Sequence, residues 1–227
     1  FVEKPIVAGS EQLKLLINAA EQNGCRLMSG HVERYNPVAV KLVSLLKNSR
    51  PAAKEYSFVR TQPYDPRIAD NIVIDKLIHD LDLAIYFFGK IKNFRLLSVK
   101  HVGGRPFEAG VRIEHENAAA GRLFVSWLTQ DGEKRRQVEI IKGGCRWMGD
   151  FVQKRLWADD NEISCRVEGM IKPSNNQIKD ELVDFIGYST EISLIKDFSP
   201  LLTIDEVVQA VNWLERINTA AMKSDNS

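Results

Sequence analysis

The sequence predicts an α+β protein, in which a mostly antiparallel, open-faced sheet carries helices on one face and follows a short helix–strand unit. Two observations predict the sheet. Apolar and charged side chains alternate over residues 111–116, and Asp131-Gly132, a two-residue hairpin signal, separates two apolar segments. A third observation predicts the preceding unit: residues 10–23 are apolar at helical spacing and residues 25–32 form a buried run, as in half of a parallel α/β repeat.

The remaining elements follow from periodicity and capping residues. Helices are expected over residues 37–48, 74–88, 175–187 and 204–222, and the first three should cover the sheet. Asn36 caps the first of these before Pro37, and Thr203 with Glu206 forms a capping box for the last. Strands are expected over residues 53–62, 122–129, 134–142, 151–157 and 163–168, with a turn at Gly143-Gly144.

The composition is typical of a globular protein and excludes several classes. Hydrophobic residues make up 44% of the 227 residues, and the formal net charge is +1, so neither nucleic acid nor an acidic membrane surface is an expected partner. No apolar run approaches the ~20 residues that span a bilayer. Three cysteines without a C-x-x-C pair argue against a zinc or disulfide framework, and we expect a cytoplasmic protein with reduced thiols.

The strongest candidate for chemistry is Asp75, His79 and Asp82, spaced to share one face of a helix. An imidazole beside a carboxylate is an acid–base group, because the carboxylate orients the ring and stabilises its protonated form. Two alternatives remain open. The three residues could form a solvated helix face with an ordinary ion pair, or they could hold a metal ion in a metal-dependent hydrolase.

Two further segments carry candidate ligand contacts. Glu3-Lys4-Pro5 could direct a lysine into a cleft, although an exposed turn explains it equally well. In residues 30–37 (GHVERYNP), His31, Glu33 and Arg34 lie between a strand end and a helix start, where α/β proteins bind ligands. Ordinary loop charges are the alternative. The sequence contains no G-x-G-x-x-G and no phosphate-binding G-K-[ST] loop.

Together these motifs resemble the Gfo/Idh/MocA family of oxidoreductases. Glu3-Lys4-Pro5 resembles the EKP motif that ends the fifth strand of the family's nucleotide-binding domain, and residues 30–37 resemble the segment that joins it to the substrate domain. Asp75-x-x-x-His79 resembles the catalytic DxxxH motif, although Lys76-Leu77 stands where many members have a glycine. Residues 30–37 and 74–83 are most similar to the nucleotide-sugar branch, such as the UDP-N-acetylglucosamine 3-dehydrogenases.

The resemblance implies an organisation and an activity. Residues 1–36 would be the C-terminal remnant of a Rossmann dinucleotide-binding domain, and residues 37–227 a substrate-binding and oligomerisation sheet domain. The activity would move a hydride between NAD or NADP and a secondary alcohol of a sugar or nucleotide sugar.

The resemblance also implies roles for individual residues. Lys4 would hydrogen-bond the reacting oxygen, His79 would act as general base, and Asp75 would orient the substrate or His79. Arg34 would contact the substrate or the nicotinamide edge, and Glu3, Lys4 and Pro5 would line the cofactor site.

Two expectations concern the whole protein. Because the chain begins at Phe1 without a glycine-rich turn, we expect the adenosine-binding part to be missing and this fragment to be inactive by itself; the alternative is a non-catalytic sugar-binding or oligomerisation module. We also expect a homo-oligomer through the sheet. Phe124 and Leu128 lie on the opposite side of their strand from Leu123, Val125 and Trp127, so both sides carry apolar groups.

Overall fold

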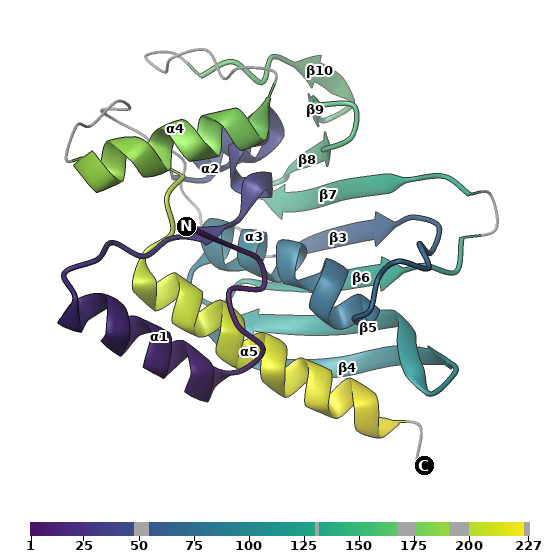
Figure 1. Cartoon of the computed structure of the whole chain (residues 1–227). Coiled ribbons are helices and arrows are strands. Elements are labelled where there is room, and N and C mark those ends of the chain that lie inside the picture. The colour runs from purple at the N-terminus through teal and green to yellow at the C-terminus, as the bar shows by residue number, and fades with distance from the viewer. Residues whose placement is uncertain (48–54, 130–131, 168–175, 191–199, 225–227) are drawn as a thin grey trace.

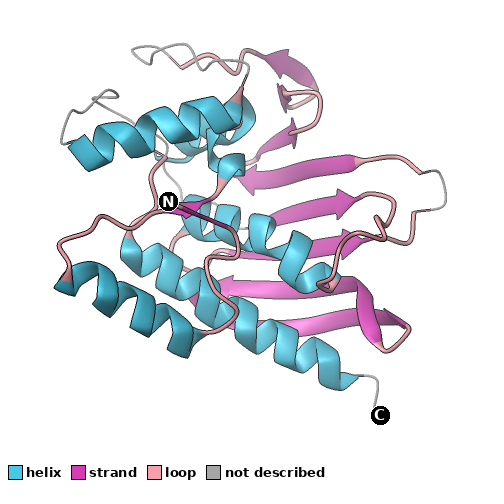
Figure 2. Cartoon of the chain, in the orientation of Figure 1, coloured by secondary structure: helices cyan, strands magenta, loops and turns pink. Residues whose placement is uncertain are grey.

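The computed structural model describes residues 1–47, 55–129, 132–167, 176–190 and 200–224. Figure 1 shows one large sheet with helices packed on one side of it, and Figure 2 separates these two layers by colour. A two-stranded parallel sheet lies near the N-terminus. The α+β class and the mostly antiparallel sheet predicted from the sequence are therefore confirmed.

The helices are α1 (Ser10–Gln22), α2 (Pro37–Lys47), α3 (Ile78–Phe88), α4 (Gln177–Thr190) and α5 (Ile204–Lys223), together with a 3-10 turn η1 (Val32–Tyr35) and a π-helical turn η2 (Val73–Leu77). The strands are β1 (Val2–Glu3), β2 (Ser29–Gly30), β3 (Glu55–Thr61), β4 (Ile91–Val102), β5 (Arg105–His115), β6 (Ala120–Ser126), β7 (Arg135–Lys142), β8 (Cys145–Asp150), β9 (Arg155–Ala158) and β10 (Asn161–Ile163).

The N-terminal unit is the predicted half-repeat of a parallel sheet. β1 pairs in parallel with β2, with Val2 opposite Ser29 and Glu3 opposite Gly30. β2 is shorter than the expected 25–32 because its only partner in the described chain is the two-residue β1. Leu13 of α1 packs in a small cluster that includes Val207 of α5, so this unit contacts the C-terminal helix.

The large sheet has the strand order β10-β9-β8-β7-β3-β6-β5-β4, and only β3 and β6 pair in parallel. The hairpin predicted at Asp131-Gly132 is wrong: β6 and β7 both flank β3 and do not pair with each other. Asp131 lies outside the described residues. The turn signal indicates a chain reversal. It cannot indicate that β3, a strand from earlier in the sequence, lies between β6 and β7. The turn at Gly143-Gly144 is confirmed, with Lys142 opposite Cys145.

Helices α2, α3 and α5 cover the inner face of the sheet. α2 approaches β8 at Gly149, where an added Cβ would lie 2.6 Å from Val38. Phe88 of α3 stacks on Tyr56 of β3 at 4.2 Å between ring centroids. The expectation that residues 175–187 cover the sheet is wrong, because α4 packs on η1 and leaves apolar side chains such as Ile178 exposed. α5 takes that place, with Trp213 against Phe94 of β4.

The helix boundaries that matter for the site were predicted by local signals. The Asn36 side chain accepts a hydrogen bond from the Val38 amide, and Thr203 forms the capping box with Glu206. Leu77, Leu81, Ile85 and Phe88 are buried, as the apolar repeat predicted. No helix in the described part of the chain is long and apolar enough to cross a membrane.

Candidate active site

The candidate site forms where the end of β1 meets η2 and the first turn of α3. Lys4 follows β1, and its Nζ donates to the Asp75 backbone oxygen at 2.8 Å and to Asp75 Oδ1 at 3.2 Å. The two side chains are only 16% and 17% exposed. Two motifs that lie 71 residues apart in the sequence are therefore joined by a partly buried ion pair.

Asp75 is held ionised by the two lysines. Its Oδ2 lies 3.0 Å from Lys76 Nζ, in addition to the contact with Lys4. Burial would raise the pKa of Asp75, but the hydrogen bonds and charges of Lys76 and Lys4 outweigh it and hold this pKa below its ordinary value. The expected contact between Asp75 and His79 is not formed. The π-helical turn η2 contains Asp75 and ends before His79, so the regular helical face assumed from the spacing does not apply.

His79 is a neutral imidazole with an unused nitrogen. Its Nδ1 is buried and has no hydrogen-bond partner among the residues that the structure describes. Burial lowers the pKa of His79 well below its ordinary value, and the charges of Arg60, Lys4, His31 and Arg136 act in the same direction. At neutral pH this ring is therefore unprotonated, and one of its nitrogens can accept a hydrogen bond.

A buried ion network lies directly beneath His79. Asp80, the next residue, accepts hydrogen bonds from Arg60 Nε and Nη2, the shorter at 2.7 Å. Glu33 Oε1 accepts from Arg60 Nη1 at 3.0 Å and from Arg136 Nη1 at 2.6 Å. The network fixes the start of α3 against β3 and β7. Sequence reasoning missed Arg60 and Arg136; the signal was available, since both occupy inward positions in alternating strands.

Arg34 does not occupy the ligand-facing position that the resemblance implied. Its guanidinium is fully buried, bound to Asp82 through Nε and Nη2 and to Glu206 through Nη1. It also lies 4.5 Å over the Tyr86 ring. Because it ties α3 to α5, it belongs to the core rather than to the site.

Asp82 is likewise unavailable for the metal site considered above. Its carboxylate is taken by Arg34 and lies 3.3 Å from His31 Nδ1. The described residues contain no group of three His, Cys, Asp or Glu side chains arranged to hold a metal ion. The metal-dependent hydrolase hypothesis therefore has no ligand set in this part of the chain.

The other residues expected at the cofactor lie beside the Lys4–Asp75 pair. Glu3 lies in β1 next to Gly30, where an added Cβ would meet the Phe1 ring at 2.8 Å. The Lys4–Pro5 peptide bond is cis. These residues and the parallel β1–β2 pair form one edge of the site, and η2 with α3 forms the other.

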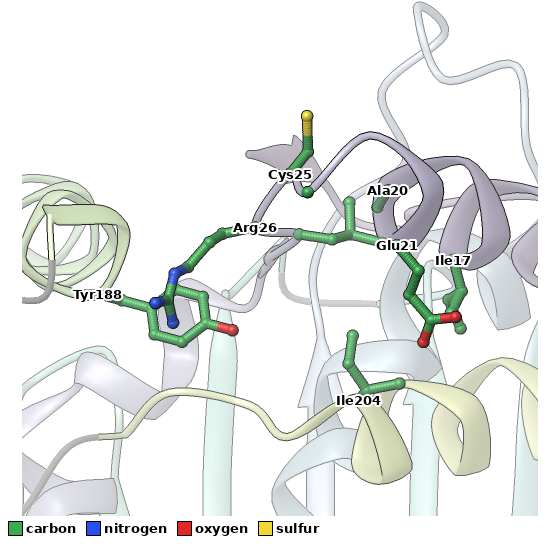
Figure 3. Close-up of a pocket in the computed structure, with 9 residues that line it drawn as sticks. Ile17, Ala20, Glu21, Cys25, Arg26, Tyr188 and Ile204 are labelled. Carbon is green, nitrogen blue, oxygen red and sulfur yellow. The ribbon is translucent and has the colours of Figure 1, made fainter.

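A separate hollow of about 350 Å³ lies between α1, α4 and the start of α5 (Figure 3). The Arg26 guanidinium lies 4.8 Å over the Tyr188 ring at its margin. Its lining contains neither Lys4 nor Asp75 nor His79, and the groups suited to acid–base chemistry are not in it.

Solved structures of oxidoreductases share this fold. The chain superposes on a Gfo/Idh/MocA family oxidoreductase from Vibrio cholerae with a TM-score of 0.74 and 15% identity, covering 100% of this chain and 71% of that one. A levoglucosan dehydrogenase, solved with NADH and levoglucosan, gives 0.76 and 12%, covering 97% and 71%. No family model matches the chain.

One particular protein is similar in both sequence and structure. The UDP-N-acetylglucosamine 3-dehydrogenase of Acidithiobacillus ferrooxidans is 24% identical over 201 residues, covering 87% of this chain and 60% of that protein. A solved structure of the enzyme from this organism gives a TM-score of 0.78 at 20% identity, covering 97% of this chain and 70% of that one. The chain thus spans about 60% of the length of this curated relative. The resemblance to Gfo/Idh/MocA oxidoreductases, including the nucleotide-sugar branch, is confirmed.

Proposed function

We propose that this chain is the substrate-domain part of an NAD(P)-dependent oxidoreductase, which moves a hydride between the nicotinamide and a secondary alcohol of a sugar or nucleotide sugar. One observation carries the proposal: the imidazole of His79, whose pKa is lowered, has a buried nitrogen without a hydrogen-bond partner among the described residues, and the charge of Lys4, the partner of Asp75, acts on this ring. The similarity to sugar dehydrogenases supports the same class of reaction.

The residues present fit the nicotinamide end of such a cofactor. Ligands of α/β proteins bind at the carboxyl ends of parallel strands, and Lys4 follows β1 at that end. Its ammonium group has three N–H donors, of which Asp75 takes two. We propose that residues 1–36 complete a dinucleotide-binding domain, with Glu3, Lys4 and Pro5 beside the nicotinamide. The bound cofactor would accept or supply the hydride.

The chain's own residues would handle the proton. The remaining N–H of Lys4 would donate to the reacting oxygen, and Asp75 would hold the lysine in place through its two hydrogen bonds. His79 would take the hydroxyl proton during oxidation and return it during reduction. This step matters because a secondary alcohol loses hydride readily only if its proton is also removed.

We further propose that the 227 residues do not bind the adenosine half by themselves, because they contain no glycine-rich phosphate turn. The fragment would then be inactive without the rest of its nucleotide-binding domain. Calorimetric titration of NADH into the fragment should show no binding, whereas the complete protein, titrated in parallel, should bind it.

A homo-oligomer through the open face of the sheet is the proposed assembly. Phe124 and Ile141 lie on that face, opposite to the buried Leu123 and Val125, and Ile141 is 43% exposed. Apolar groups exposed together on one face usually mark an interface.

The reaction class can be tested with the complete protein. Purified protein would be mixed with NAD+ or NADP+ and with UDP-N-acetylglucosamine, levoglucosan or simple hexoses, and absorbance followed at 340 nm. We expect reduction of the nicotinamide with at least one sugar, and His101→Ala, which removes an imidazole from β4, should not change it. Absence of hydride transfer with all of these sugars and both cofactors would contradict the proposal.

A further inference from the structure

Two arginines face each other directly beside the candidate site. Arg60 of β3 and Arg136 of β7 are register partners, and both point to the helix side of the sheet. Like charges directly opposite on one face are destabilising, so this arrangement needs compensation. Glu33 lies between them and accepts from both, at 3.0 and 2.6 Å. Asp80 binds Arg60 alone.

Arg136 is left with incomplete compensation. It shares one carboxylate with Arg60, its side chain is 26% exposed, and its Nε is buried with no hydrogen-bond partner in the part of the chain described. A guanidinium has five N–H donors, and Glu33 takes one of them. The Nη donors of Arg136 that Glu33 does not take are available to a ligand, whereas Nε is buried.

Lys134 extends this positive surface. It lies two positions before Arg136, just ahead of β7, and is exposed without an ion pair to any described residue. The charge of Arg136 is the main cause that lowers the pKa of Lys134, and Lys76 and Arg60 add to it.

The formal charges of the cluster do not cancel. Lys4, Arg60, Lys76, Lys134 and Arg136 are five cations, whereas the carboxylates bound among them are Glu33, Asp75 and Asp80. One of the two surplus positive charges is on the β7 side, where Lys134 and Arg136 have only Glu33 nearby, and the other is at Lys4 and Lys76, which share Asp75. The charges of Arg60, Lys4 and Arg136 all act on the ring of His79.

We infer that the substrate carries an oxyanion, a phosphate or a carboxylate, which Arg136 and Lys134 bind on the β7 side of His79. The inference rests on the proposed function for the position of the sugar, but its electrostatic basis is independent of hydride transfer. Arginine suits planar, bidentate recognition of either anion, and lysine adds a mobile point charge. A neutral sugar would leave the surplus charge uncompensated.

The test is calorimetric titration of the complete protein saturated with NADH, so that the cofactor's own phosphate site is filled. Pyrophosphate and D-glucuronate distinguish the two sources of anion, and D-glucose is the neutral probe. We expect one or both anions to bind and glucose to bind at least about tenfold more weakly, since a charged hydrogen-bonded pair is lost.

Three variants locate the binding. Lys134→Gln, which breaks no ion pair, should weaken anion binding several-fold, and Arg136→Gln should weaken it about tenfold or more. Arg135→Gln is the matched control: it removes one positive charge from the same strand, but from the outward register position. It should leave binding within twofold. If Lys134→Gln binds the anions as well as the wild type, or if all three variants lose binding equally, the inference is overturned.

Measuring both anion binding and sugar oxidation with the complete protein distinguishes a failure of this inference from a failure of the proposed function. Anion binding that depends on Arg136 and Lys134, without any sugar oxidation, would contradict the proposed function and support this inference. Oxidation of neutral and anionic sugars with equal KM, unchanged in Lys134→Gln, would overturn the inference and leave the function standing.

Discussion

Glu181, a buried carboxyl group on α4, should make the stability of this protein fall as the pH rises. Its side chain is fully buried, and neither oxygen meets the geometry of a hydrogen bond to any described residue. Burial raises the pKa of Glu181 to about 7; the His31 backbone amide opposes this, whereas the charges of Glu3 and Asp82 add to it.

The sign and size of the effect follow from linkage. In the unfolded chain Glu181 titrates near its ordinary 4.5, so between pH 4.5 and 7 the folded state binds more protons. The stability contributed by the protonated group is complete below pH 4.5, decreases as the pH rises to about 7, and is absent above it. At 1.36 kcal/mol per pKa unit, the loss is about 3 kcal/mol.

The assay is urea denaturation of wild type and Glu181→Gln at intervals from pH 4.5 to pH 8. The amide cannot ionise. The free energy of unfolding of the variant minus that of the wild type should therefore increase by about 2–3 kcal/mol from pH 4.5 to pH 8. Glu116→Gln, at an exposed turn, is the control and should shift by less than about 0.5 kcal/mol. A constant difference between Glu181→Gln and wild type at every pH would refute the reasoning.

Three further predictions concern the core, the open face and the site. Arg34→Ala leaves a buried carboxylate without its partner and should cost about 3–5 kcal/mol in urea denaturation, whereas Arg67→Ala, at an exposed pair, should cost less than about 1 kcal/mol. Phe124→Asp should convert the oligomer to monomers in light scattering, and Leu15→Asp, on exposed α1, should not; a wild type that is monomeric at all concentrations would contradict this. Lys4→Met in the complete protein should lower kcat about 10–100-fold, with little change in the urea midpoint; unchanged kcat would exclude Lys4 from the site.

Local sequence signals were sufficient to predict helix starts and tight turns. The capping box at Thr203 and Glu206 predicted the start of α5, and the glycine pair after Lys142 predicted the turn at the end of β7, although β8 itself was expected only from residue 151. The insertion of β3 between β6 and β7 could not be predicted this way, because it depends on strands about 70 residues apart in the sequence.

The site was predictable in part, for the same reason. Lys4, Asp75 and His79 belong to short motifs that the sequence displays directly. Arg34 also lies in such a motif, yet tertiary packing places its guanidinium in the core against α3 and α5. Strand alternation could have placed Arg136 on the inward face of the sheet, but it could not indicate the partner Glu33, which is 103 residues away.

The central claim is that His79 is the general base, and one measurement tests it most directly. In the complete protein, the turnover of His79→Ala would be compared with that of the wild type from pH 6 to 9, using the sugar and cofactor that support hydride transfer. We expect turnover to fall by about 10²–10⁴-fold, the usual effect of losing an acid–base group. Near-normal turnover across this pH range would contradict the account and leave His79 as a structural residue of α3.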